Sequence, residues 1–275
     1  MSLGVDVVVP TFNRPDALAR CLMALESQTV APTSIQVIDD SETDYGPGRS
    51  RNSGWKKGRA EIVAFLDDDC IAPINWIETI VGIFEKNDHI GGIEGSMTTE
   101  DENGDIIPYN PPTRFKWDRF KTANLIVKRE ALEKVNGFDE RYYLHREDTD
   151  LAWRVIDAGY SIIWSPECVM HHPDPLGSMG TYAPYPGSEQ LLYRCNPKKY
   201  VESAAGLISI KSVIEGDLWR LQKQLRMNQE PNNVKPLNRF ESWILWGKAW
   251  SVAVFWLTRK NILGEPKNVG ENLKP

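Results

Sequence analysis

Short apolar runs alternate with stretches of helical periodicity along the first part of the chain. Three runs rich in β-branched residues predict strands buried on both faces of a parallel sheet, at residues 5–10, 35–40 and 61–69. Between the first two, Leu18, Cys21 and Leu25 recur at helical spacing, and Asn13 is a suitable N-cap. Residues 48–58 predict a short crossover, so we expect a right-handed β-α-β-α-β unit.

The pattern continues less regularly after residue 70. It predicts a helix at 74–87, a strand at 90–97, a polar loop at 99–112, a strand, short helix and Asn136–Gly137 turn within 122–140, a helix at 146–160, a strand pair within 161–174, and a loop at 175–189. The helix at 146–160 should bury Leu151, Val155 and Ile156 and end at Gly159. From about Lys198 the chain reads as mostly helical. We therefore predict an α/β domain over 1–200 and a C-terminal helical extension over 201–275.

Polar side chains follow each of the first three predicted strands: Thr11 and Asn13, then Asp39 and Asp40, then Asp67, Asp68 and Asp69. Because carboxyl ends of parallel strands share one edge of a sheet, where such sheets bind ligands, we expect these groups to converge. Two of the adjacent carboxylates repel by roughly 3 kcal/mol at about 5 Å, which open solvent or a bound cation would offset. Asp67 and Asp69, on alternate positions, suit Mg²⁺ or Mn²⁺. Taken alone, the triplet fits a charged loop better.

Two acids begin the helix predicted at 146–160. Glu147 and Asp148 lie where the helix macrodipole keeps carboxylates ionised, and an ionised carboxylate is also a general base. Asp150 and Arg154 are spaced as a stabilising i,i+4 pair. Acids are common in first turns for stability alone, so this signal is weak by itself.

A histidine pair, His171 and His172, follows the last predicted strand. Imidazole binds Mn²⁺ and other transition metals. Because adjacent strand residues face opposite ways, at most one of the two is expected to be a ligand. Taken alone, the two histidines fit a surface pair or a packed ring better than a metal site.

Composition narrows the class of protein. The 275 residues suffice for one α/β domain with an appendage. A formal net charge of −6 without a basic run argues against nucleic acid as a partner. Four scattered cysteines without a CxxC pair indicate reduced thiols, and no basic segment followed by an apolar one opens the chain. We therefore expect a cytoplasmic protein.

Six motifs occur in a characteristic order: VVVPTFNR, VIDDSETD, GRSRNSGWKKGRAEIVAFLDDD, TANLIVKREALEKVNGFDE, REDTDLAWRVIDAGY and SPECVMHH. In this order and spacing, over roughly residues 5–196, the chain resembles the inverting family 2 glycosyltransferases. The resemblance implies the GT-A fold, a Rossmann-like, mostly parallel sheet flanked by helices, within the 1–200 domain. It also implies a nucleotide-diphospho-sugar donor (a UDP-sugar favoured, a dTDP- or GDP-sugar as alternatives) and a Mn²⁺ or Mg²⁺ ion.

The resemblance also implies roles for individual residues. The donor site would comprise Pro10, Thr11, Asn13, Asp39, Asp40, Arg51, Asp67 and Asp68. Asp40, or else Asp39, would accept a hydrogen bond from a pyrimidine N3–H, and Arg51 would lie along the nucleotide. Asp69, with Asp67 nearby, would bind the metal together with His172 or His171, of which the spacing favours His172. Asp148 would be the catalytic base, with Glu147 beside it.

The acceptor implied is a glycan or a lipid-linked glycan, in surface polysaccharide or glycan synthesis. An alternative from another class is a catalytically idle GT-A domain that binds nucleotide or glycan. A sugar nucleotidyltransferase is a weaker alternative, because PTFNRPDA at residues 10–17 contains no glycine.

The segment 243–257 carries Trp243, Trp246 and Trp250 on one helical face. It would form about 22 Å of helix, too short for a bilayer core of about 30 Å. It is expected to lie at a membrane interface, bringing the protein peripherally to the inner face of a membrane, or to pack on the domain or in a homodimer.

Overall fold

The computed structural model describes residues 3–101, 103–109 and 120–173, and the single positions 188, 191, 192, 195, 196 and 199. The chain divides into two units, one of Met1–Tyr143 with Glu147–Gly180 and one of Leu144–Arg146 with Thr181–Pro275. Nearly all the described residues belong to the first unit. The predicted extension at 201–275, with its tryptophan-rich segment, lies outside them. No helix among the described residues has both the length and the apolar character needed to cross a membrane.

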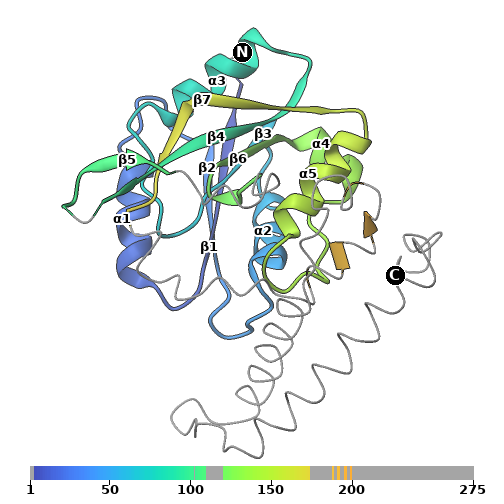
Figure 1. Ribbon diagram of the computed structural model, residues 1–275, viewed down its shortest axis with the longest axis horizontal. Coiled ribbons are helices and arrows are strands. Elements are labelled where there is room, and N and C mark those ends of the chain that lie inside the picture. The colour runs from blue at the N-terminus through green and yellow to red at the C-terminus, as the bar shows by residue number, and fades with distance from the viewer. Residues whose placement is uncertain are drawn as a thin grey trace, which may run out of the picture. The chain divides into compact units, whose positions relative to one another are not determined.

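The first unit is built on a seven-stranded mixed sheet with the strand order β2-β1-β3-β6-β4-β5, in which β7 also pairs with β4. Its elements are β1 (Val5–Thr11), α1 (Pro15–Glu26), β2 (Ser34–Asp39), α2 (Pro47–Trp55), β3 (Ile62–Phe65), α3 (Trp76–Lys86), β4 (Ile90–Glu100), β5 (Ile106–Pro108), the 3-10 turn η1 (Thr122–Asn124), β6 (Leu125–Lys128), α4 (Arg129–Val135), α5 (Glu147–Asp157) and β7 (Ser161–His171). Strand β1 runs parallel to β2 and β3, and β7 runs parallel to β4 (Figure 1). The predicted α/β fold with flanking helices is confirmed.

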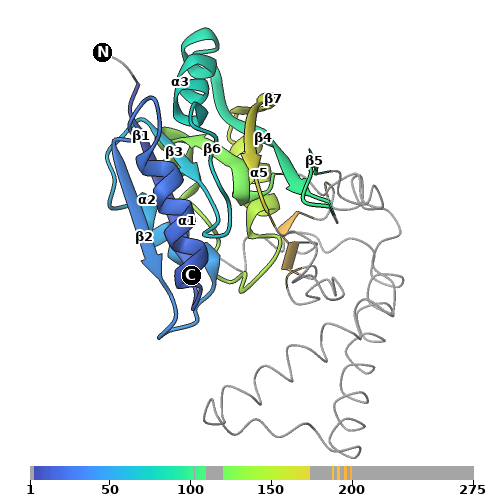
Figure 2. The same cartoon turned by 90° about the vertical axis from the view of Figure 1, so that its left-hand side faces the viewer.

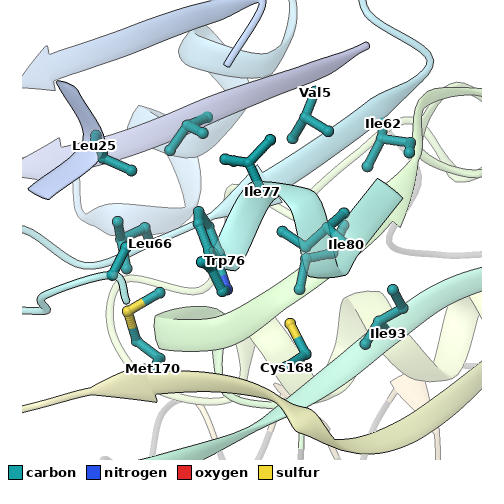
Figure 3. Close-up of a cluster of buried hydrophobic side chains, with 14 of the residues drawn as sticks. Val5, Leu25, Ile62, Leu66, Trp76, Ile77, Ile80, Ile93, Cys168 and Met170 are labelled. Carbon is teal, nitrogen blue, oxygen red and sulfur yellow. The ribbon is translucent and has the colours of Figure 1, made fainter. Parts of the chain in front are cut away.

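Side-chain alternation along β1 creates two cores. Val5, Val7 and Val9 belong to the core that α1 and α3 cover, whereas Val8 belongs to the core that α2, α4 and α5 cover. Figure 2 shows the strands side by side in the order from β2 to β5, with α1 in front of the sheet. Trp76 of α3 lies in the middle of the first core and its indole N–H donates to Asn124 Oδ1 at 3.0 Å (Figure 3). A strand buried on both faces explains the unbroken apolar run in the sequence.

The start of α1 differs from the prediction. Arg14, not Asn13, occupies the N-cap position, and it makes no side-chain cap. Pro15 stands at the first helical position, where its fixed φ and missing N–H suit a helix start, so the proline sets the boundary. Asn13 instead adopts a left-handed backbone with φ 54°, which asparagine tolerates.

Three further predictions are corrected. The polar loop expected at 99–112 contains a hairpin, because β4 extends to Glu100 and β5 returns along it. The carboxylate of Asp101 closes that turn by accepting backbone N–H groups. The strand pair expected within 161–174 is the single strand β7, and a register shift absorbs its irregular middle. Of the three residues expected to be buried in α5, Leu151 and Val155 are buried, whereas Ile156 is 38% exposed.

Candidate active site at the carboxyl edge of the sheet

The carboxyl ends of β1, β2 and β3 meet at one edge, as predicted from the parallel order. Thr11, the last residue of β1, is in register with Asp39, the last residue of β2. Its hydroxyl donates to Asp68 Oδ2 at 2.7 Å, which connects β1 to the acidic triplet behind β3. Residues 57 positions apart in the sequence are thereby in direct contact.

The three carboxylates of the triplet have different surroundings. Asp68 is fully buried, and Arg14 Nη2 lies 2.6 Å from its Oδ1. Burial raises the pKa of Asp68, although the Thr11 hydroxyl and the Arg14 guanidinium act in the opposite direction. Asp69 is partly exposed and pairs with Arg14 as well. Asp67 pairs with a different arginine, because its Oδ1 lies 2.8 Å from Arg51 Nη2.

Arg51 of α2 joins the triplet to the start of α5. Its Nη2 donates to Asp67 Oδ1 at 2.8 Å and its Nη1 donates to Glu147 Oε1 at 3.0 Å. Burial alone lowers the pKa of the guanidinium, but the charges of Asp67 and Glu147 outweigh it and raise that pKa. Glu147 Oε2 is buried and has no hydrogen-bond donor among the described residues. Arg51, expected along the nucleotide, therefore has its charge engaged inside the protein.

The first turn of α5 presents three acids in different environments. Glu147 is buried against Arg51, and Asp150 is buried with the Arg154 Nε at 2.7 Å, the i,i+4 pair predicted from the sequence. Asp148 is partly exposed, and its Oδ1 accepts the Thr149 N–H at 2.6 Å. Of these three acids, Asp148 is therefore the one that the solvent reaches.

The two histidines face different groups. His172 Nε2 lies 3.4 Å from Asp69 Oδ1. His171 instead lies beside β4, with Nδ1 3.1 Å from Thr98 Oγ1 and Nε2 3.4 Å from Glu100 Oε1. A two-way backbone bridge between Ile71 and His171 holds the end of β7 beside the segment that follows the triplet.

Asp69, Cys70 and His172 each offer one ligand atom, and these atoms lie within 4.8 Å of one another. That spacing fits a single cation, and carboxylate with imidazole is a donor set that suits Mn²⁺. Sequence reasoning missed Cys70, whose only signal was its position next to the triplet. Burial, with the charges of Asp67 and Asp69, raises the pKa of its thiol well above the usual range.

Asp39, the last residue of β2, and Asp40 after it also have different surroundings. Asp40 is buried and closes the following loop, accepting the Thr43 hydroxyl at 2.5 Å and the Gly46 N–H at 2.7 Å. Asp39 is exposed, and its Oδ1 accepts the Ser41 N–H at 2.9 Å, which lowers its pKa. Asp40, favoured from the sequence for a nucleotide base, is thus occupied by its own loop, and Asp39 faces the solvent.

The other predicted donor-site residues lie at the end of β1. Pro10 is buried within the strand, and Asn13 is exposed in the turn before α1. That Pro10 and Asn13 contact a bound nucleotide stays a prediction.

Asn52, next to Arg51, is a second residue that sequence reasoning missed. Its Nδ2 donates to the Phe138 carbonyl at 2.8 Å, and its Oδ1 accepts the Phe138 N–H at 2.9 Å. A Cβ on Gly137 would lie 2.4 Å from Asn52 Oδ1, so only glycine fits there. Asn52 thereby attaches α2 to the turn after α4, while Arg51 attaches α2 to α5.

Two known protein families match the part of the chain that contains the candidate site. Residues 42–133 match the family model described as Glycosyl transferase family 2. Residues 108–172 match a second model, described as N-terminal domain of galactosyltransferase. The first match contains the acidic triplet, and the second contains Asp148 and both histidines.

Curated proteins are similar over parts of the chain that range from a quarter to nearly two thirds of its length. Glycosyltransferase AglE of Haloferax volcanii is 25% identical over 210 residues, covering 64% of this chain and 69% of that protein. The pre-mycofactocin glycosyltransferase of Mycobacterium tuberculosis is 25% identical over 202 residues, covering 61% of this chain and 42% of that protein. The N-acetylglucosaminyl-diphospho-decaprenol L-rhamnosyltransferase of Mycobacterium tuberculosis is 35% identical over 81 residues, covering 25% of this chain and 26% of that protein.

Proposed function

We propose, from the premise that this chain belongs to glycosyltransferase family 2, that it transfers a sugar from a nucleotide-diphospho-sugar to an acceptor hydroxyl with inversion at the anomeric carbon. The observation that carries the proposal is the buried guanidinium of Arg51, which binds Asp67 and Glu147 at 2.8 and 3.0 Å. It holds the carboxylates behind β3 next to the first turn of α5. The donor-binding groups and a general base are therefore adjacent.

Asp148 is the proposed base. Its partial exposure supports this role, as does the ionised form favoured by the helix macrodipole and by the Thr149 N–H. As the acceptor oxygen bonds to the anomeric carbon, its proton passes to Asp148. The bond from that carbon to the diphosphate oxygen breaks, and the electron pair leaves with the diphosphate. Glu147 acts through Arg51 and positions this turn.

Asp69 and His172 would hold a Mn²⁺ or Mg²⁺ ion. The thiol of Cys70 lies within 4.8 Å of both ligand atoms. When bound, the cation supplies Lewis-acid stabilisation of the departing diphosphate. Asp67 and His171, the other candidates from the sequence, have partners of their own in Arg51 and in Thr98 with Glu100. We therefore assign neither of them as a ligand of the cation.

Asp39 is the proposed acceptor for the N–H of the nucleotide base, in place of Asp40. Its exposure at the end of β2, beside Thr11, supports this assignment. Asp68 and Thr11 form the floor of the donor site. A UDP-sugar is the favoured donor, and dTDP- and GDP-sugars are the alternatives to compare.

A glycan or lipid-linked glycan is the proposed acceptor, in glycan or surface polysaccharide synthesis. The supporting observation is the similarity to an enzyme whose name specifies a diphospho-decaprenol acceptor. Because the matched region covers only a quarter of each chain, it indicates an acceptor class and no particular sugar.

A direct test measures nucleoside diphosphate release from UDP-, dTDP- and GDP-sugars, with Mn²⁺, with and without a prenyl-diphospho-sugar acceptor. We expect one class of donor to release its nucleoside diphosphate, and we expect this release to require the acceptor. Asp148→Asn is the matched control and should bind the donor without releasing product. If the parent binds nucleotide and never transfers sugar to any acceptor, the idle binding module is the better description.

A further inference from the structure

The guanidinium of Arg14 pairs with two carboxylates of the acidic triplet, as a bound cation would. Its Nη1 donates to Asp69 Oδ2, and its Nη2 lies 2.6 Å from Asp68 Oδ1. That Asp68 oxygen is buried and still lacks a hydrogen bond of normal geometry from any described residue. The guanidinium thus offsets the charge of Asp68 without satisfying its lone pairs.

The backbone of Arg14 is held in place, whereas its side chain lies partly in the solvent. Asn13 precedes it with φ 54°, Pro15 follows it, and its carbonyl accepts the Leu18 N–H at 3.0 Å in the first turn of α1. The side chain itself is 49% exposed. Because the guanidinium lies on the solvent side of the two carboxylates, it can leave by side-chain rotation without moving α1 once another cation compensates the buried charge of Asp68.

We propose that Arg14 is an exchangeable counterion of the donor site, which occupies Asp68 and Asp69 when no divalent cation is present and turns to the diphosphate of the donor when one binds. The inference rests on the proposed function for the nature of the cation and the donor. A guanidinium and a divalent cation repel strongly at contact distance, so both cannot lie against Asp69. The displaced guanidinium finds its best new partner in a diphosphate, which it binds in bidentate fashion.

The exchange has a consequence for the order of binding. A free cation must displace Arg14 and leave that charge without a partner, so it binds weakly by itself. A nucleoside diphosphate that arrives with the cation supplies the partner. Arg14 therefore couples the binding of cation and donor, and its removal should weaken that coupling.

Titration calorimetry with Mn²⁺ alone, and with Mn²⁺ in the presence of the nucleoside diphosphate that binds the parent, tests the exchange. Arg14→Ala should bind Mn²⁺ alone about five- to tenfold more tightly than the parent, because the cation then meets no competing guanidinium at Asp69. It should bind the nucleoside diphosphate with Mn²⁺ less tightly. Arg14→Gln, which keeps a polar side chain without the charge, should behave alike. Arg20→Ala, an exposed arginine of the same helix, removes the same charge and should match the parent.

Three outcomes would overturn the inference. Unchanged Mn²⁺ affinity in Arg14→Ala and Arg14→Gln, in a protein whose parent binds both ligands, removes the exchange and leaves the proposed function standing. Equal tightening in Arg20→Ala would attribute the effect to net charge alone. A parent that binds neither Mn²⁺ nor any nucleoside diphosphate removes the proposed function, and this inference with it.

Discussion

Arg51 and Glu147 form an ion pair at 3.0 Å with side chains only 4% and 7% exposed. Asp67 completes the arrangement from the other side of the guanidinium. This contact connects the helix α2, the loop after β3 and the first turn of α5. Substitutions at the site should therefore separate into those that alter chemistry and those that alter this attachment.

Arg51→Met should destabilise the protein by about 3–5 kcal/mol, because it leaves the buried carboxylate of Glu147 without a cation. Urea unfolding followed by circular dichroism measures the change. The double variant Arg51→Met/Glu147→Gln should recover part of the loss. Arg49→Ala, on the same helix, breaks an exposed pair with Glu140 and should cost less than about 1 kcal/mol. Equal effects of Arg51→Met and Arg49→Ala would contradict the role of the buried pair.

Asp148→Asn should lower the rate of transfer by about 10² or more while donor affinity stays near that of the parent, since only the proton acceptor is lost. Steady-state rates and donor titration together measure this. Asp150→Asn should do the reverse, lowering thermal stability through its pair with Arg154 while the rate per folded molecule persists. Full activity in Asp148→Asn would place the base elsewhere.

Asp69→Ala should abolish Mn²⁺-dependent binding of nucleoside diphosphate with the fold intact, because it removes a proposed ligand and relieves repulsion within the triplet. His172→Ala should weaken the same binding less. His171→Ala is the matched control and should leave it unchanged, since that ring faces Thr98 and Glu100. Calorimetry with and without Mn²⁺ gives the answer, and a larger loss in His171→Ala than in His172→Ala would reverse the assignment.

The stability of the protein should fall at high pH partly because of Cys168. Burial raises the pKa of this thiol from 9.0 to about 12. Between those values the folded chain keeps the proton and the unfolded chain loses it, so the free energy of unfolding falls by about 1.4 kcal/mol per pH unit. Cys168→Ala should show a shallower fall in urea unfolding between pH 8 and pH 10.5. Parallel curves for the two proteins would show that the thiol is not protected.

Gly46→Ala should destabilise the loop that Asp40 closes. Gly46 has φ +96°, and an added Cβ would lie 2.2 Å from the Tyr143 carbonyl oxygen, so we expect a loss of about 1–3 kcal/mol. Gly82→Ala, in α3 with nothing within 4 Å of its Cβ, should be neutral or stabilise by up to about 1 kcal/mol. Thermal unfolding distinguishes them, and a tolerated Gly46→Ala would mean that the loop adopts another conformation.

The sequence by itself determined most strands and helices of the first unit, β5 and the form of β7 excepted, and the edge where the polar ends of β1, β2 and β3 meet. The apolar runs of β1 and β3, the helical spacing in α1 and the Asn136–Gly137 turn are local periodicities and turn preferences, which depend on residues two to four positions apart. Parallel order then requires Thr11, Asp39 and the acidic triplet to share an edge. Boundaries were missed where a single residue overrides the period, as Pro15 does at α1 and the Asp101 turn does after β4.

Only the tertiary structure decided which of the neighbouring candidates turns toward the site. Arg51 meets Glu147 across 96 positions, and no local pattern carries that pairing. His172 rather than His171 lies beside Asp69, because the bridge of His171 to Ile71 sets the orientation of the strand end. Asp40 accepts hydrogen bonds from its own loop, and Arg14 pairs with Asp68 and Asp69. These outcomes follow from packing between distant segments, in which each buried charge takes the nearest compensating partner because burying it alone costs too much.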